Sequence, residues 1–173
     1  ERLVHAAGYG DTFGTCATDY GPISGLICSE NANPLAAMAL TAEATRFHVM
    51  GYPAYFGLAG GPMSDSVMLD ARSFATTSGA FVIAACGAVD NDALSTIGAS
   101  DDDRRIIDQP GYGGGSVIVG PDGRVLAGPL GPQEQILYAE CDPELSIRRK
   151  LVLDFAGHYN RPDIFRLSLN RER

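Results

Sequence analysis

The sequence contains no tryptophan, a single lysine and only three histidines in 173 residues. Zinc sites usually present cysteine or histidine ligands in close pairs, and no such pair occurs here. The cysteines number only four, too few and too irregularly spaced for a disulfide framework: Cys16, Cys28, Cys86 and Cys141. We therefore expect free thiols in a reducing compartment, and neither a metal nor another cofactor.

Long apolar runs and excess positive charge are also missing. No run approaches the roughly 18 apolar residues that span a bilayer, and the start of the sequence does not resemble a secretory signal. The formal net charge of −8 at pH 7 argues against binding to nucleic acid or to an anionic membrane surface. The sequence thus predicts a cytoplasmic location, with no nucleic-acid or membrane partner.

Length and composition are those of one folded domain. The 173 residues match the typical size of a domain, and 45% hydrophobic with 20% charged residues is close to the average for globular proteins. We therefore treat residues 1–173 as one domain. The sequence begins at Glu1, within the stretch ERLVHAAGYGDTF.

The first half predicts alternating strands and helices. Residues 11–21 and 22–28 (PISGLIC) each favour a strand, and the Tyr-Gly-Pro turn between them suggests a hairpin. Asn33 and Pro34 are typical of a helix start, and apolar residues at helical spacing extend that helix to position 47. Residues 47–53 (FHVMGYP) then predict a buried strand.

The second half continues this alternation, which is typical of an α/β layered fold. The expected elements are a helix over 66–79 ending at Gly79, a buried strand over 80–89, a loop with at most one short helix over 90–115, a hairpin over 116–129, a strand over 135–142, a helix over 143–153 and an extended arm over about 155–173.

Cys28 stands where the apolar run of residues 22–28 ends and a helix is about to begin. A sharp turn from strand to helix exposes a side chain at the sheet edge, where backbone N–H groups can stabilise an anion. A buried packing role is the competing interpretation, because free cysteine is among the most buried residue types. Nearby Glu30 is interpreted as an acceptor for backbone N–H groups rather than as a catalytic group.

The stretch GLICSENANPLAAMAL (25–40) resembles the nucleophile motif of the nitrilase superfamily. Two further stretches are similar to that family and follow in its order: GGGSVIVGPDGRVLAGPLGPQEQILYAECD (113–142) and LDFAGHYNRPDIFRLSLN (153–170). The resemblance places the nucleophile region at 21–47. It implies a four-layer α-β-β-α sandwich, of which this chain is an incomplete, C-terminal part.

The activity implied by the resemblance is hydrolysis of a small-molecule nitrile to a carboxylic acid and ammonia. By motif, Cys28 is the nucleophile that forms a thioimidate and then a thioester, and Glu1 matches the family's second glutamate. The general-base glutamate and the catalytic lysine have no counterpart in residues 1–173, so we expect this chain alone to be inactive. The family also implies homo-oligomers, as dimers or helical assemblies.

The resemblance further suggests residues that contact substrate. Ser29 follows the nucleophile where true nitrilases usually carry tryptophan, and the loss of an indole should widen the pocket or change which nitriles fit. Tyr52, Pro53 and Tyr55 follow the strand after the nucleophile helix and are candidates for the pocket wall, although packing explains such tyrosines equally well.

Several alternatives remain open at this stage. An amidase or a cyanide-hydrolysing relative of the same fold would use the same nucleophile. A non-catalytic scaffold subunit would keep the fold without the chemistry. A cysteine–histidine acyltransferase would pair Cys28 with His48 or His158.

Overall fold

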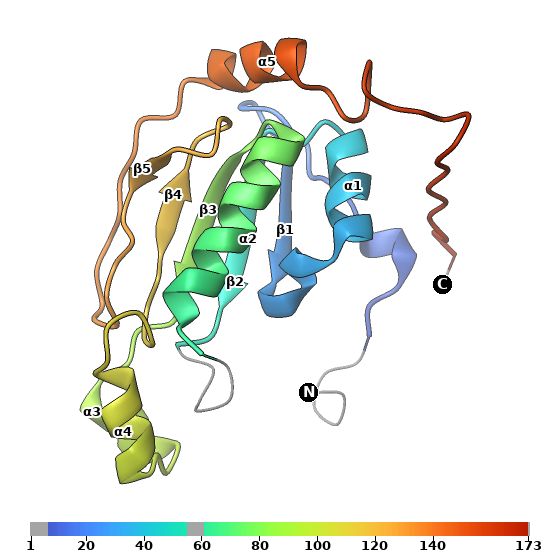
Figure 1. The fold of residues 1–173 in the computed structure, drawn as a ribbon. Coiled ribbons are helices and arrows are strands. Elements are labelled where there is room, and N and C mark those ends of the chain that lie inside the picture. Colours follow the sequence, from blue (N-terminus) through green and yellow to red (C-terminus); the bar gives the residue numbers. More distant parts are fainter. Residues whose placement is uncertain (1–6, 55–60, 173) are drawn as a thin grey trace.

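The computed structural model describes residues 7–54 and 61–172. Within this part of the chain one sheet of five strands runs in the order β1-β2-β3-β4-β5 (Figure 1). The strands are β1 (Ile23–Ile27), β2 (Phe47–Tyr52), β3 (Phe81–Cys86), β4 (Val117–Val119) and β5 (Val125–Ala127). The first three are parallel, and β4 and β5 are antiparallel to their preceding neighbours. The expected hairpin over 116–129 is confirmed.

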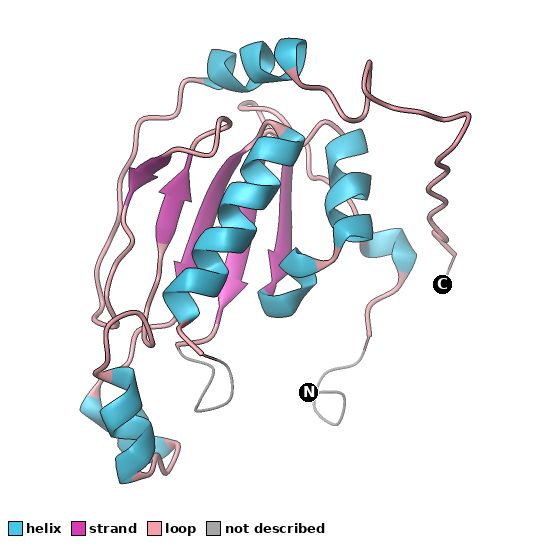
Figure 2. Cartoon of the chain, in the orientation of Figure 1, coloured by secondary structure: helices cyan, strands magenta, loops and turns pink. Residues whose placement is uncertain are grey.

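Helices cover one face of this sheet (Figure 2). The helical elements are η1 (Gly10–Thr12), η2 (Cys28–Ala32), α1 (Pro34–Ala42), α2 (Met63–Ser78), α3 (Asn91–Thr96), α4 (Asp101–Ile107) and α5 (Pro143–Val152). The first two long helices, α1 and α2, lie side by side against the sheet. The short pair α3 and α4 lies beyond one end of the strands, and α5 crosses the other end.

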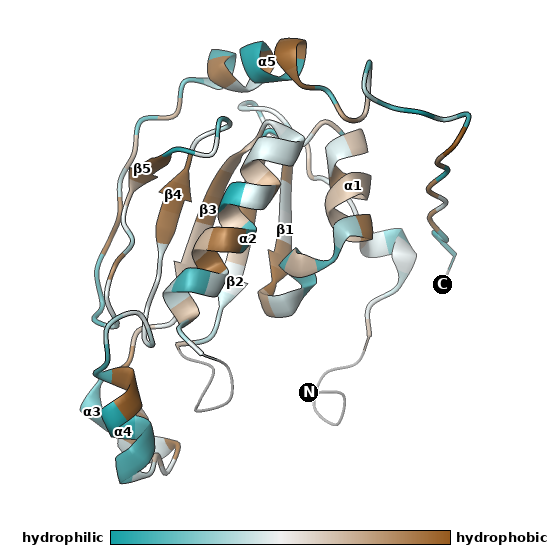
Figure 3. Cartoon of the chain, viewed as in Figure 1, coloured by the Kyte–Doolittle hydropathy of each residue, from teal (hydrophilic) through white to brown (hydrophobic). Residues whose placement is uncertain are grey.

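The core lies between α2 and the strands. Met50 and Val82 on the sheet and Val67 and Phe74 on α2 are each at most 3% exposed. Strands β3 and β4 are among the most hydrophobic elements in Figure 3, and β4 is hydrophobic over its whole length. Strand residues alternate between the two faces, so their neighbours point the other way. The α/β class expected from the sequence is therefore confirmed.

The second face of the sheet has no helical layer within the described residues. Val49 and Ile83, which alternate with the core residues of β2 and β3, are 42% and 37% exposed. Gly25 and Ala85 on the same face are exposed too. One helical layer and one sheet are half of the four layers that the resemblance implies.

Local signals fixed the helix starts. The Asn33 side chain accepts from the Leu35 N–H at 3.0 Å, and Pro34 is the first residue of α1. Asp142 caps α5 in the same way by accepting from the Glu144 N–H at 3.0 Å. Such caps satisfy backbone donors that have no partner inside the helix.

The predicted end of the first long helix is wrong. We expected it to reach Phe47, but α1 ends at Ala42 because Ala44 adopts a left-handed φ of +59°. The Thr45 N–H then bonds back to the Leu40 carbonyl at 3.3 Å. After this turn the chain continues into β2. The hydrogen bonds that β2 forms with β1 and β3 stabilise the fold more than further turns of helix would.

Four other expectations need correction. The hairpin over 11–28 is reduced to one antiparallel bridge between Cys16 and Ile23, because β1 pairs with β2 instead. Residues 135–142 form no strand, and residues 90–115 hold two helices rather than one. Helix α2 begins at Met63, earlier than position 66, with Pro62 before it. Its C-terminal cap at Gly79 is confirmed, with a left-handed φ of +66°.

Hydrogen bonds attach α5 and the tail to the domain. Lys150 Nζ donates to the Thr45 carbonyl at 2.9 Å, and Ser146 Oγ donates to the Gly79 carbonyl at 2.6 Å. The tail contains turns rather than one extended arm, and Arg171 pairs with Glu43 beside α1. None of the helices in the described ranges is both long and apolar enough to cross a membrane.

Candidate active site

Two cysteines and a tyrosine lie where the parallel strands end: Cys28, Cys86 and Tyr52. Tyr52 ends β2 and stands directly opposite Cys86, which ends β3. In the adjoining pair, Ile27 at the end of β1 stands opposite Gly51, so the next residue, Cys28, lies at the same edge. Sheets of this kind bind ligands at the carboxyl ends of their strands.

Cys28 lies at the expected corner. It directly follows β1, begins η2 and adopts a left-handed φ of +52°, which costs a non-glycine residue about 1 kcal/mol. The residue is half-buried, and its Sγ lies 3.8 Å from Ser29 Oγ. It packs against the edge of the core yet keeps solvent access. The thiol is therefore not sealed within apolar packing.

A buried polar chain begins beneath this corner. The Asn31 side-chain nitrogen donates to the carbonyls of Cys28 and Leu26 at 2.9 and 3.3 Å. Its Oδ1 lies 3.0 Å from His48 Nε2, and His48 Nδ1 lies 2.7 Å from Ser24 Oγ. The chain continues from Ser24 Oγ to Thr45 Oγ1 over 2.7 Å.

The hydrogen bonds assign the proton on His48. Because both Asn31 nitrogen protons are directed at carbonyls, Asn31 Oδ1 requires a donor, so His48 Nε2 carries the proton. Nδ1 of the neutral ring then accepts from Ser24 Oγ. Burial lowers the pKa of His48 to about 4, so the ring is neutral at pH 7.

The alternative that pairs Cys28 with a histidine finds no support in these contacts. Both ring nitrogens of His48 are engaged by Asn31 and Ser24, and the ring stacks on Phe74 with a centroid distance of 3.7 Å. His158 is an exposed tail residue beside Tyr159.

Tyr52 is buried at this edge and hydrogen-bonded to α2. Its hydroxyl donates to Asp70 Oδ2 at 2.8 Å. Burial raises the pKa of Tyr52 far above its ordinary value, and Asp70, Cys28 and Cys86 act in the same direction. This phenol is therefore a hydrogen-bonding group and not an acid at physiological pH.

Cys86 is a second thiol at the same edge. Burial raises the pKa of this thiol to about 11, which keeps it protonated at neutral pH. Only the thiolate is strongly nucleophilic, so Cys86 fits a packing role.

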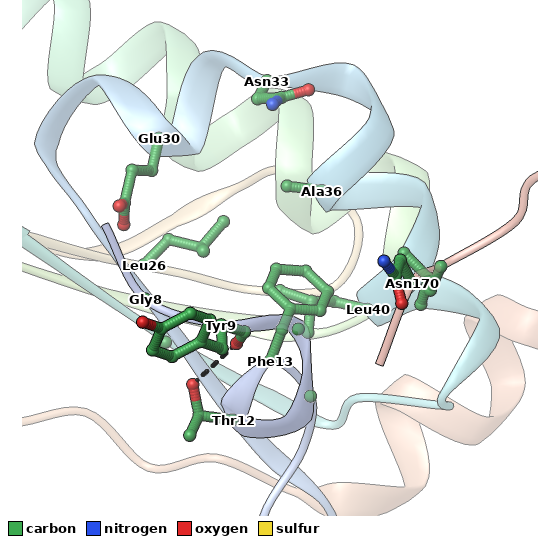
Figure 4. A pocket seen from close by; sticks show the side chains of 14 residues that line it. Gly8, Tyr9, Thr12, Phe13, Leu26, Glu30, Asn33, Ala36, Leu40 and Asn170 are labelled. Carbon is green, nitrogen blue, oxygen red and sulfur yellow. Dashed lines mark hydrogen bonds between the residues drawn. The ribbon is translucent and has the colours of Figure 1, made fainter. Parts of the chain in front are cut away.

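A cavity of about 480 Å³ lies near the turn that follows Cys28, between η1, β1 and α1 (Figure 4). Glu30 and Leu26 line it together with Tyr9 and Phe13, but Cys28 does not. The Glu30 carboxylate accepts from the Ile27 N–H at 2.9 Å, as the sequence predicts. Glu30 therefore stabilises the turn from its outer side.

The structure brings together four of the six predicted site residues. Ser29 is exposed next to Cys28, and Pro53 is exposed just after Tyr52. Glu1 and Tyr55 lie outside the described residues. Lys150 contacts Thr45 at the opposite end of β2, so it is not a partner for the thiol. In the described part of the chain, no group of three or more His, Cys, Asp or Glu side chains could hold a metal.

Sequence reasoning missed Asn31 and Asp70 as members of this site, and it considered His48 only as a possible base for Cys28. Alternation along β2 was the available signal for His48, since it places this residue on the same face as Met50 and Tyr52. The contacts of Asn31 and Asp70 depend on tertiary packing and had no local signal.

Comparison with known proteins identifies the family. The carbon-nitrogen hydrolase family model matches residues 1–150. A nitrilase of Pseudomonas syringae pv. syringae is 36% identical over 98% of this chain and 51% of its own length. For an aliphatic nitrilase of Rhodococcus rhodochrous the identity is 35%, over 98% of this chain and 45% of that protein. A cyanide hydratase of Botryotinia fuckeliana is 31% identical over 100% of this chain and 48% of its length.

Solved structures show the same fold. A carbon-nitrogen hydrolase from Helicobacter pylori superposes with a TM-score of 0.67 at 22% identity, covering 87% of this chain and 50% of that one. Nit3 of Saccharomyces cerevisiae, a nitrilase-superfamily member, gives 0.63 at 25% identity, with 90% and 49% covered. The chain spans about half the length of the curated relatives it matches. It belongs to the carbon-nitrogen hydrolase family, within the nitrilase superfamily.

Proposed function

We propose that this chain supplies the nucleophile of an enzyme that hydrolyses nitriles to carboxylic acids and ammonia. The observation that carries the proposal is the left-handed turn that holds a half-buried Cys28 thiol at the carboxyl edge of the sheet. Its nitrilase relatives, at 36% and 35% identity over nearly the whole chain, support the substrate class.

In the proposed reaction the Cys28 sulfur bonds to the nitrile carbon, and the nitrile nitrogen takes up a proton to give a thioimidate. Water adds to this carbon, and ammonia leaves to give a thioester. A second water then releases the carboxylic acid and restores the thiol. Two waters are consumed for each nitrile, and no oxidant, metal or other cofactor is required.

We also propose that activity requires polypeptide beyond residues 1–173. Two observations support this: the chain spans about half of its relatives, and one sheet face exposes Val49 and Ile83. A second sheet and helical layer would cover that face. The missing part would provide the general-base glutamate and the lysine, while Glu1 would be the second glutamate of the site.

The test joins this chain to the unmatched half of the Pseudomonas syringae nitrilase. Ammonia release from an aliphatic nitrile and from an arylacetonitrile is measured for the joined protein and for the 173-residue chain. We expect activity only in the joined protein. Hydrolysis by the shorter chain would refute the need for a second part, and a cooperatively folded but silent joined protein would refute the nitrilase assignment.

Ser29 is proposed to shape the substrate range, since it is exposed beside the thiol. Introducing Ser29→Trp into the joined protein adds a side chain that occupies about 150–250 Å² of contact surface, and we expect bulky nitriles to lose kcat/KM relative to small ones. Matched assays with an aliphatic nitrile and an arylacetonitrile measure this ratio. An unchanged ratio would show that Ser29 does not line the substrate pocket.

A second candidate is a cyanide-hydrating activity, which the cyanide hydratase relative favours. Hydration would expel the Cys28 thiolate, rather than ammonia, from the tetrahedral intermediate and would yield an amide. Measuring amide and ammonia in the same assay separates the two outcomes, and an inert joined protein would favour a scaffold subunit. A homo-oligomeric state and a cytoplasmic location remain part of the proposal, to be tested by light scattering and by fractionation.

A further inference from the structure

The left-handed conformation of Cys28 needs a restraint. Unfavourable backbone conformations persist only where surrounding contacts fix them. Within residues 7–54 and 61–172, the only other non-glycine residue with a positive φ is Ala44. That residue follows the end of α1, where left-handed backbone is common, whereas Cys28 directly follows a strand and is the first residue of a 3-10 helix.

Asn31 provides such a restraint. Its side-chain nitrogen binds the carbonyls of Leu26 and Cys28, which lie on either side of the Ile27–Cys28 peptide unit. Asn31 is itself only 5% exposed, so these bonds have little competition from water. The orientation of both carbonyls, and with it the direction of the Cys28 side chain, depends on where this amide points.

His48 fixes the direction of that amide. Its Nε2–H is the donor to Asn31 Oδ1 at 3.0 Å, and the side chain is fully buried. Rotating the Asn31 side-chain amide by 180° would bring its NH₂ group close to the His48 N–H, donor to donor. It would also bring its oxygen close to the two carbonyls, acceptor to acceptor. The ring in turn is held by Ser24 at Nδ1 and by the stacked face of Phe74.

We propose that Asn31 and His48 are positioning residues for the Cys28 thiol. Neutral His48 acts through Nε2–H on Asn31, and Asn31 acts on the two carbonyls that set the turn. His48 thus affects the reaction without exchanging a proton with substrate. The catalytic consequence rests on the proposed nitrilase function, but the effect on the backbone at Cys28 does not.

Two substitutions at position 48 separate positioning from packing. His48→Gln carries an amide nitrogen near the place of Nε2 and can still donate to Asn31. His48→Asn carries its amide near the place of Nδ1 and reaches Ser24 but not Asn31. Both lose the ring stacked on Phe74 and both remove the titration, so they are matched for charge; they differ in the position of the amide and by one methylene group.

In His48→Gln the remaining hydroxyls can stay satisfied. Ser24 Oγ can donate to Thr45 Oγ1 at 2.7 Å, and Thr45 Oγ1 can donate to the Phe47 carbonyl at 3.0 Å. His48→Asn instead leaves the Asn31 Oδ1 atom without its donor. Asn31→Ala is the second variant, because it removes both carbonyl bonds while keeping the histidine.

The first readout is NMR of the 173-residue chain labelled with ¹³C at cysteine, because Cα and Cβ shifts report backbone conformation. Signals are assigned with Cys28→Ala. We expect His48→Gln to keep the left-handed shifts of Cys28, and His48→Asn and Asn31→Ala to lose them while Cys16 is unchanged. Equal Cys28 shifts in the two His48 variants, or unchanged shifts in Asn31→Ala, would overturn the proposal.

The second readout is hydrolysis by the joined protein. We expect kcat to fall by roughly 10-fold or more in His48→Asn, with KM changed less than about threefold, and His48→Gln to stay within about threefold of the parent. An equal loss of kcat in both variants would contradict positioning. If the parent joined protein is inactive, the nitrilase proposal fails, whereas the NMR comparison still decides the role of His48.

Discussion

Replacing Cys28 by alanine is expected to lower nitrile hydrolysis by the joined protein by on the order of 10⁴-fold or more. The substitution removes the sulfur atom that forms the thioimidate in the proposed reaction, from a position where the thiol is only half-buried. Other polar groups nearby cannot replace it, because Tyr52 is a buried phenol bonded to Asp70. Initial rates of ammonia release, with the protein concentration matched, measure the loss.

Cys86→Ala is the matched control for this prediction. It removes a second thiol from the same edge, but one whose pKa burial raises to about 11. We expect the activity of this variant to stay within about threefold of the parent, since a protonated thiol contributes little nucleophilicity. A large loss in Cys86→Ala together with activity in Cys28→Ala would reverse the assignment of the nucleophile.

Acid is expected to destabilise the 173-residue chain through His48. The pKa of this residue is lowered from 6.5 to about 4 by burial, so the unfolded state binds a proton before the folded state does. The stabilisation is fully present above pH 6.5 and is lost as pH falls toward 4. One pKa unit corresponds to about 1.4 kcal/mol, so the loss in unfolding free energy is about 3 kcal/mol. Urea unfolding at a series of pH values measures it.

His48→Gln serves again as the comparison, because glutamine does not titrate. The difference in unfolding free energy between parent and variant should shrink as pH falls from 6.5 to 4 and be constant above 6.5. Carboxylates such as Glu43, whose pKa is lowered in the folded state by Arg171 and the Thr15 N–H, contribute equally to both proteins and cancel. A pH-independent difference would show that His48 is not buried in its neutral form.

The sequence predicted those features that depend on neighbours along the chain. Asn33–Pro34 and Asp142–Pro143 begin helices because a side-chain oxygen and a fixed proline φ act within two residues. The β4–β5 hairpin follows from its central Gly-Pro-Asp-Gly turn. The corner at Cys28 was also predicted, because an apolar strand run stops there and polar residues follow.

Features that depend on distant residues could not be predicted in this way. The sequence of residues 11–28 predicted a hairpin. In the fold β1 instead pairs with the parallel strand β2, where Ile23 lies opposite Phe47, 24 positions further along the chain. Parallel pairing needs a crossover connection, and this connection stabilises the fold only when its helix packs on the sheet. The pairing of β2 with β1 and β3 likewise ended α1 at Ala42, earlier than the helical spacing predicted.

The same distinction between local and tertiary features applies to the candidate site. Sequence alone predicted the corner at Cys28 and the family, because the stretch 25–40 that resembles the family's nucleophile motif is short and continuous. Only the tertiary structure decided which side chains support this corner: Asn31, His48 and Ser24 come from separate elements and meet beneath the turn. Buried polar groups must find partners wherever the fold places them, and those partners are set by packing rather than by distance along the chain.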